Sequence, residues 1–244
     1  MSEWWSKVVA DFQLNFIESD RWVSLLKGLG VTLEITACAV IIGIVLGAFV
    51  ATVRSTYDKN VEAMKRNKTP GFYVLSVLNV ICKLYLTVIR GTPTVVQLMI
   101  CYFIIFASST NDVGVAVFAF GINSGAYVAE IFRGGIMSIP QGQFEAGRSL
   151  GFNYAQTMIY VVIPQVFKSV LPALCNEFIV LIKETSIAGY IGIVDLTKAG
   201  DLIRGRTFSA FMPLIAVAII YLVLVVVLTA LVGKLERRLR VSER

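Results

Sequence analysis

The sequence predicts an all-α polytopic membrane protein with five transmembrane helices. Of its 244 residues, 57% are hydrophobic and the mean hydropathy is +0.76, well above the values of a soluble domain. Only 16% of the residues are charged, and these cluster between long apolar runs. The alternating segments of roughly ten residues that mark a membrane β-barrel do not occur in the sequence.

The first 27 residues are expected to form an external or interfacial segment rather than a span. Acidic residues among the first twenty argue against a cleavable signal peptide. Apolar and aromatic side chains recur at roughly helical spacing, which would place tryptophans at the level of the lipid headgroups. These residues are Trp4, Trp5, Val8, Val9, Phe12 and Phe16.

The first span is predicted over residues 28–53. Within it, Gly43 and Gly47 are four residues apart, a spacing that lets two helices approach closely. The loop that follows, residues 54–68, holds five basic residues against Asp58 and Glu62. Because cytoplasmic loops of membrane proteins are enriched in lysine and arginine, we place this loop in the cytoplasm.

Residues 72–107 admit two interpretations. Hydropathy alone could divide them into two spans around Pro93. However, polar residues recur at steps of three and four on both sides of that point, namely Ser76, Asn79, Lys83, Thr87, Arg90, Thr94 and Gln97. That spacing puts them on one helical face. A helix of this length would be about 54 Å long, against a hydrocarbon core of roughly 30 Å. We therefore expect a single pass, in which the first half lies near the cytoplasmic interface, Pro93 kinks the helix and the second half crosses.

Three further spans are predicted over residues 113–132, 160–182 and 211–232. Prolines 164 and 172 interrupt the second of these. Before the last span lies a glycine-rich loop of mixed charge, residues 183–207. Its Gly189–Gly192 portion fits either a flexible external gate, such as a re-entrant segment, or an ordinary outer loop.

The distribution of basic residues sets the expected topology. Five passes place the amino terminus outside, and they place the loop at 133–148 and the basic tail at 233–244 inside. Six passes from the same cytoplasmic loop would export a tail with five basic residues, against the positive-inside bias. The chain therefore divides into an external segment (1–27), a transmembrane domain (28–232) and a cytoplasmic tail (233–244). The net charge of +6 reflects the same loop bias and predicts no nucleic-acid partner.

The sequence contains few signs of catalysis. It has no histidine, which removes the commonest general base and metal ligand. It contains no G-x-x-x-x-G-K-[ST] pattern, so ATP is not expected to bind through a P-loop, and no nucleophile elbow or metal-ligand spacing occurs. We predict that the chain is not an enzyme, binds no cofactor or metal, and uses its membrane-embedded polar residues to bind or conduct.

One cytoplasmic stretch carries a specific pattern. It reads Glu145-Ala-Gly-Arg-Ser-Leu-Gly151, then nine residues, then Val161-Val-Ile-Pro164. This resembles the coupling motif of ABC-importer permease subunits, E-A-A-x-x-x-G followed by nine residues and I-x-L-P. Gly147 stands in place of the third-position alanine, and Val161 and Ile163 replace the aliphatic pair. Two further patterns look like the polar amino-acid (histidine/glutamine/arginine-type) branch: Asn123-Ser-Gly-Ala-Tyr127 with Glu130, and Arg90-Gly-Thr-Pro93 with Gln97.

The resemblance, which covers the chain from about Gly28 onward, implies a fold and an assembly. The expected fold is that of a type I importer (MetI-like) permease in the bacterial cytoplasmic (inner) membrane. It implies pairing with a second permease subunit and docking of two cytoplasmic ATPase subunits, which would hold ATP and Mg²⁺. An external binding protein would deliver the substrate, a polar amino acid, for translocation by alternating access.

The ATPase-coupling residues implied by the motif are Phe144, Glu145, Ala146, Gly147, Leu150 and Gly151. They are expected on a short amphipathic helix at about residues 142–151. Phe144 and Leu150 could fill a groove in the ATPase, whereas Glu145 could cap the helix start or pair with a cation of the partner. The alternative is an ordinary amphipathic surface loop.

Polar side chains at membrane depth suggest the substrate path, because such groups are costly in lipid. Asn123, Tyr127 and Glu130 share one helical face. An amino acid needs an acid for its ammonium group and donors for its carboxylate; Glu184 with Thr185 and Ser186, opposite Asn123 and Gln97, could supply both. Arg90 is expected to be a structural or gating residue on the cytoplasmic side. The structural alternative is internal neutralisation, Glu184 by Lys183 and Glu130 by Arg133.

Two other functions remain compatible with the sequence. A secondary transporter could use an ion gradient through Glu130, Glu177 and Glu184, and a membrane scaffold or sensory subunit could use the cytoplasmic helix only to recruit a partner. The coupling pattern favours the importer over both. The identity of the amino acid and the choice between homodimer and heterodimer stay open at this point.

Overall fold

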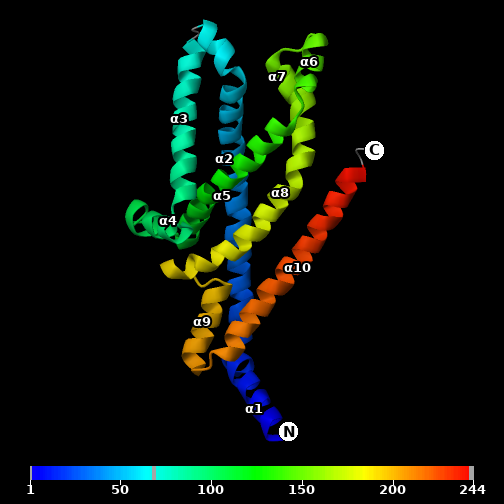
Figure 1. Ribbon diagram of the computed structural model, residues 1–244. Helices are drawn as coiled ribbons and strands as arrows, with labels where there is room; N and C mark the ends of the chain where they lie inside the picture. Colours follow the sequence, from blue (N-terminus) through cyan, green and yellow to red (C-terminus); the bar gives the residue numbers. More distant parts are fainter. Residues whose placement is uncertain (1, 68–69, 242–244) are drawn as a thin grey trace.

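The computed structural model describes residues 2–67 and 70–241, and within them every regular element is helical (Figure 1). In chain order the elements are α1 (Ser2–Phe12), η1 (Gln13–Ile17), η2 (Glu18–Asp20), α2 (Arg21–Asn67), α3 (Pro70–Gly91), α4 (Thr94–Ile100), η3 (Cys101–Ile105), α5 (Asp112–Ser138), α6 (Gln141–Ser149), α7 (Tyr154–Thr157), η4 (Met158–Val162), α8 (Ile163–Glu184), η5 (Thr185–Ile191), α9 (Leu196–Thr207) and α10 (Phe211–Val241). Among the described residues, five helical stretches are long and apolar enough to cross a membrane, which confirms the predicted number of spans.

Helix α2 is the longest element and the axis of the bundle. Its 47 residues would measure about 70 Å, so it extends well beyond a hydrocarbon core of roughly 30 Å. The loop predicted at residues 54–68 is therefore wrong up to Asn67, because α2 continues through it. No glycine or proline occurs between residues 54 and 67, so the sequence offers nothing to end the helix there.

Small residues let α5 lie directly against α2. A Cβ atom added at Gly43 would lie 2.9 Å from the Ser124 Oγ, and one at Gly47 would lie 2.6 Å from a methyl carbon of Val128. Neither site accepts a larger side chain without a shift of α5. The spacing of the two glycines thus produces the close helix contact that the sequence predicts.

The second pass is a broken helix. Helix α3 ends at Gly91, Pro93 is extended (φ −64°, ψ 135°), and α4 starts at Thr94. Leu86 of α3 packs with Val50 and Val53 of α2. Leu98 of α4 packs with Ile35 and Ala39, which lie closer to the amino end of α2. Helices α3 and α4 therefore pack against successive parts of α2.

This pass agrees with the expected single crossing but differs in two ways from the expected kinked helix. The chain breaks at Pro93 instead of kinking, because proline lacks a backbone donor and restricts the residue before it. By length and composition, α3 is the candidate span, whereas Thr94–Ile105 is shorter than a span requires. The expectation that only the second half crosses does not hold by this criterion.

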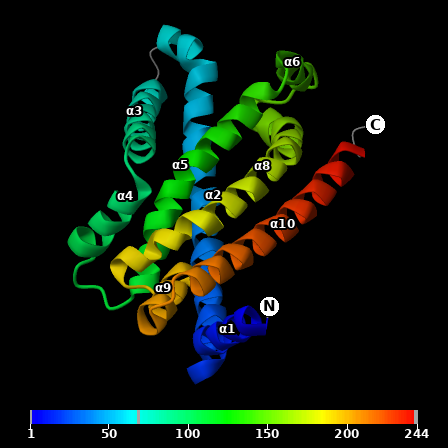
Figure 2. The same cartoon turned by 60° about the horizontal axis from the view of Figure 1, so that its bottom comes forward.

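Three later helices cross α2. Figure 2 shows α5, α8 and α10 running beside one another across it. The fourth span begins at Tyr154, earlier than predicted, because Asn153 and Gln156 form a capping box: each side chain accepts the backbone N–H of the other at 2.9 Å. The fifth helix runs from Phe211 to Val241 and so carries part of the predicted tail.

The predicted loop at 183–207 contains the ordered helix α9. Asp195 starts this helix by accepting the backbone N–H groups of Thr197 and Lys198, both at 3.0 Å. Leu196, Ala199 and Ile203 on its inner face are buried against a small apolar cluster that includes Leu25 and Val217. The segment therefore contains a packed helix between α2 and α10, preceded by the short 3₁₀ helix η5.

Candidate functional site

Helix α6 occupies the stretch that carries the cytoplasmic motif. Pro140 precedes it and the helix runs from Gln141 to Ser149. It ends in a Schellman motif: the Phe152 N–H donates to the Gly147 carbonyl at 3.0 Å and the Gly151 N–H to the Arg148 carbonyl at 2.9 Å. Gly151 has φ +82°, a left-handed conformation that glycine adopts without strain. The motif glycine therefore ends the helix and turns the chain towards α7.

One side of α6 is fixed within this chain. The Phe144 side chain is only 5% exposed, stacks on Tyr154 with ring centroids 6.5 Å apart, and receives the Lys59 ammonium 3.7 Å from its ring centroid. Gly147 lies so close to Thr157 that a Cβ atom would come 2.6 Å from the Thr157 hydroxyl. Phe144 thus anchors α6 to α2 and α7 and does not present its ring to another protein, contrary to the expectation from sequence.

The other side of α6 is free within the described residues. Glu145, Ala146 and Leu150 are exposed, Leu150 to 74% of its surface. Glu145 lies in the second turn of the helix, and no side chain caps its start, so the expected capping role of this glutamate is not observed. An exposed apolar side chain and an exposed carboxylate on the same short helix are suited to contact with a protein partner.

Gln97 and Asn123 meet at the break in the second pass. The Asn123 amide donates to the Gln97 side-chain oxygen at 3.0 Å, while the Gln97 amide nitrogen bonds the carbonyls of Ile89 at 2.7 Å and Thr92 at 3.0 Å. Gln97 therefore satisfies carbonyls that the interruption at Pro93 leaves without helical partners. The Asn123 Oδ1 atom is buried and has no hydrogen-bond partner in the described part of the chain. These two predicted site residues lie together.

The other predicted path residues are dispersed. Thr185 is fully buried, with its hydroxyl donating to the Ile182 carbonyl at 2.8 Å and lying 3.4 Å from that of Thr36. Ser186 lines a separate pocket between η5, α9 and α10. Glu184 ends α8 and is half-buried. Tyr127 is 38% exposed and faces Arg90, whose guanidinium lies 5.9 Å from the ring centroid. The structure does not gather these residues around one point.

Glu130 lies at the centre of an ion-pair cluster that joins three helices. Its carboxylate is 3.2 Å from Arg133 on its own helix, as one of the sequence alternatives suggested. It also lies 3.5 Å from Arg90 at the end of α3 and 3.9 Å from Arg54 of α2. Sequence reasoning missed the last two partners, since it placed Arg54 in a loop. The absence of a helix breaker after residue 53 was the signal that could have placed Arg54 on α2.

A second polar contact joins α5 to α8. The Ser124 hydroxyl donates to the Glu177 carboxylate at 2.9 Å. In the described residues, no group of three or more histidine, cysteine, aspartate or glutamate side chains is placed to hold a metal ion. Together, these polar groups can form hydrogen bonds and ion pairs between helices, and they can line a path for a polar solute.

Known proteins share this sequence and fold. The chain is 36% identical to the arginine transport system permease protein ArtQ of Bacillus subtilis (strain 168), over 90% of this chain and 94% of that protein. It is 40% identical to the glutamine transport system permease protein GlnP of Escherichia coli (strain K12), over 68% and 77%. The L-cystine transport system permease protein TcyB of Bacillus subtilis (strain 168) is 32% identical, over 92% and 90%.

Solved structures agree with these relatives. A chain in the crystal structure of an amino acid ABC transporter with histidines matches with a TM-score of 0.77 and 38% identity, over 91% of this chain and 98% of that one. The inward-facing MetNI methionine ABC transporter shares the fold, with a TM-score of 0.69 at 21% identity, over 90% and 96%. Residues 69–241 match the family described as "Binding-protein-dependent transport system inner membrane component". The chain therefore belongs to this family of multi-pass inner-membrane permeases and is not itself the ATPase.

Proposed function

We propose that this chain is the membrane-spanning subunit of an ATP-driven importer that moves polar amino acids into the cell by alternating access. The observation that carries the proposal is α6, a short helix anchored on one side and exposed on the other, which lies between two candidate spans, α5 and the stretch Tyr154–Ile191 that contains α8. Relatives named for arginine, glutamine and cystine transport support polar amino acids as the substrate class.

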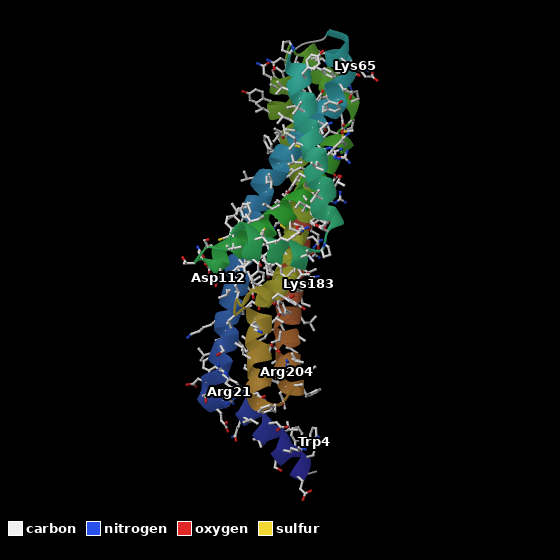
Figure 3. All side chains as sticks on the ribbon, turned by 90° about the vertical axis from the view of Figure 1, so that its left-hand side faces the viewer. Trp4, Arg21, Lys65, Asp112, Lys183 and Arg204 are labelled. Carbon is white, nitrogen blue, oxygen red and sulfur yellow. The ribbon has the colours of Figure 1, made fainter. Side chains whose placement is uncertain are left out.

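We propose an orientation with the amino terminus outside and the carboxyl terminus in the cytoplasm. The last turn of α2 and the first turn of α3 lie at the same end of the molecule as α6, and α1 lies at the opposite end (Figure 1). Figure 3 shows Lys65 at the first end and Trp4 at the other. The basic sequence around Lys65 supports a cytoplasmic position for its end, and the exposed Trp4 supports an interfacial position for α1.

The coupling surface is proposed on α6. Glu145, Ala146 and Leu150 would contact an ATPase subunit, since they are exposed. Phe144 and Gly147 would hold the helix in place, and Gly151 would set its end. Membership of the family implies ATPase partners and a binding protein. We extend this to two ATPase subunits that bind ATP and Mg²⁺, a second permease subunit and an external binding protein.

The substrate path is proposed along the polar residues of α4, α5 and the α8–η5 junction. Gln97 and Asn123 are its best-supported pair, because they are hydrogen-bonded to one another and the buried Asn123 Oδ1 atom has no partner among the residues that the structure describes. Tyr127, Glu184 and Ser186 are half-buried or exposed and can reach a solute. Thr185 is fully buried in this conformation, so it would contact substrate only after η5 moves.

Reconstitution tests this function. The chain is purified with its ATPase and permease partners, placed in nanodiscs, and assayed for ATP hydrolysis with the binding protein and a panel of amino acids. We expect hydrolysis to rise only when the binding protein carries its amino acid. Amino-acid flux driven by an ion gradient without ATP hydrolysis would instead identify a secondary transporter, and partner recruitment without either activity would identify a scaffold.

A further inference from the structure

A polar cavity lies between α2, α3 and α5. Its volume is about 450 Å³, within the ~300–1,000 Å³ range of small-molecule pockets. The charged side chains that line it are Arg54, Lys83, Arg90 and Glu130, and Thr87 adds a hydroxyl. Three cations against one carboxylate leave the lining with an excess of positive charge. Such a lining favours an oxyanion.

The cations are incompletely satisfied. The Arg54 Nε atom is buried and has no hydrogen-bond partner among the described residues. Arg54 and Arg90 lie 3.9 and 3.5 Å from Glu130, longer than the ~2.7–2.9 Å of strong charge-assisted hydrogen bonds. Lys83 makes no ion pair within residues 2–67 and 70–241. Hydrogen-bond donors on these cationic side chains therefore remain available to bind an anion.

The position of the cavity on α3 indicates contact with water or with another chain. Lys83, Thr87 and Arg90 follow one another at steps of four and three, so they share one face of a candidate membrane span. Val80, Leu84 and Val88 are exposed on the adjoining face and suit lipid. Lysine and arginine side chains at such depth should face water or protein rather than lipid. The polar face of α3 therefore borders an aqueous path or another chain.

We propose that this cavity binds the α-carboxylate of the transported amino acid, an inference that rests on the proposed function. The site is distinct from the Gln97–Asn123 pair and lies nearer to α6, because Glu130 is two helical turns closer to the end of α5 than Asn123. Lys83 and Arg54 supply the charge that holds the carboxylate. A substrate would thus meet the amide pair first and the cationic cavity on the cytoplasmic side of it.

The test compares probes with and without a carboxylate. Binding of L-arginine and agmatine, and of L-glutamine and 4-aminobutanamide, is measured on the assembled complex in nanodiscs without the binding protein. Wild type should bind at least one carboxylated probe more tightly than its decarboxylated analogue. Lys83→Met should reduce that ratio of dissociation constants about tenfold, which corresponds to about 1.4 kcal/mol. A merely structural loss would weaken both probes of a pair equally.

Matched variants separate charge from fold. Lys83→Arg retains the charge and should keep the ratio within about twofold. Lys27→Met removes an exposed lysine of α2 outside the cavity and should leave the ratio unchanged. Absence of any carboxylate preference in wild type, or an unchanged ratio in Lys83→Met, would overturn the proposal.

A lipid phosphate is the other possible source of the oxyanion. If wild type retains phosphatidylglycerol that Lys83→Met loses, while the probe ratio stays unchanged, the cavity is a lipid site and the proposal fails. ATP hydrolysis stimulated by the loaded binding protein is measured on the same samples. If the loaded binding protein still stimulates ATP hydrolysis but the ratio of dissociation constants does not depend on Lys83, only this inference is refuted. If the loaded binding protein does not stimulate ATP hydrolysis by the wild-type complex, the proposed function itself is refuted.

Discussion

Gly151 offers the sharpest test of the coupling helix. Its φ of +82° lies in the left-handed region, where a residue with a Cβ atom is strained by roughly 1–2 kcal/mol. A Cβ atom at this position would have no heavy atom within 4 Å, so the cost arises from the backbone and not from crowding. At 1–2 kcal/mol, the population of the correctly ended helix relative to alternatives falls by a factor of roughly 5–30.

The side chain at position 151 should therefore set the size of the defect. Asparagine tolerates the left-handed region, so Gly151→Asn should keep most of the coupling between substrate and ATP hydrolysis. Gly151→Val combines positive φ with a β-branched side chain and should lose most of it. Gly151→Ala should fall between the two. The assay is ATP hydrolysis in nanodiscs, with and without the loaded binding protein.

Gly142 provides the matched control on the same helix. A Cβ atom there also meets nothing within 4 Å, and the residue does not have positive φ. Gly142→Ala should leave coupling unchanged and slightly favour α6, by up to about 1 kcal/mol, because alanine is the better helix former. Coupling in Gly151→Val equal to wild type, or equal defects in Gly142→Ala and Gly151→Ala, would refute the role of the left-handed turn.

Three further substitutions test the packing that supports the site, each by thermal unfolding of the purified complex. Gly47→Ala pushes a methyl group into Val128 and should cost about 1–3 kcal/mol, whereas Gly30→Ala, with open space around it in the same helix, should not destabilise the protein. Phe144→Ala removes a buried aromatic ring and should cost about 3 kcal/mol together with coupling, whereas Leu150→Ala should reduce coupling without loss of stability. Asp195→Ala removes the start of α9 and should cost about 1–2 kcal/mol, and Asp195→Asn, which keeps the acceptor, should restore most of it.

Local signals predicted the number of spans and one helix contact correctly. The apolar runs gave five spans, since length and hydropathy are properties of the segment itself. The i, i+4 spacing of Gly43 and Gly47 gave the close approach of α2 to another helix, although nothing in the spacing named α5 as that helix. The partner depends on contacts between residues some eighty positions apart, for which a single sequence carries no signal.

Two of the failures share a physical cause. Charge, and in the second case glycine content, predict loops at residues 54–68 and 183–207, yet residues 54–67 and 196–207 are helical. A charged segment extends out of the membrane but can remain helical. Helix-breaking residues and capping residues determine where the helix ends. Asp195 ahead of Leu196 is a helix cap that the sequence offers, and α9 is also packed through Leu196, which is buried against residues far away in the sequence. Composition alone does not decide whether such a segment is helical, and packing against distant residues does.

A continuous set of contacts links α6 to the break in the second pass. Lys59 of α2 lies over the Phe144 ring and 3.4 Å from the Ile136 carbonyl at the end of α5. Glycine packing holds α5 to α2 along the next turns, and Glu130 joins both to Arg90 just before Pro93.

From these contacts we predict where the bundle bends. Helices α2 and α5 are locked by close backbone approach, whereas the break at Pro93 lacks continuous helical hydrogen bonds and is held by the Gln97 side chain. A displacement of α6 by a partner would therefore be carried by α2 and α5 as one body. It would be absorbed at Pro93, beside the Gln97–Asn123 pair.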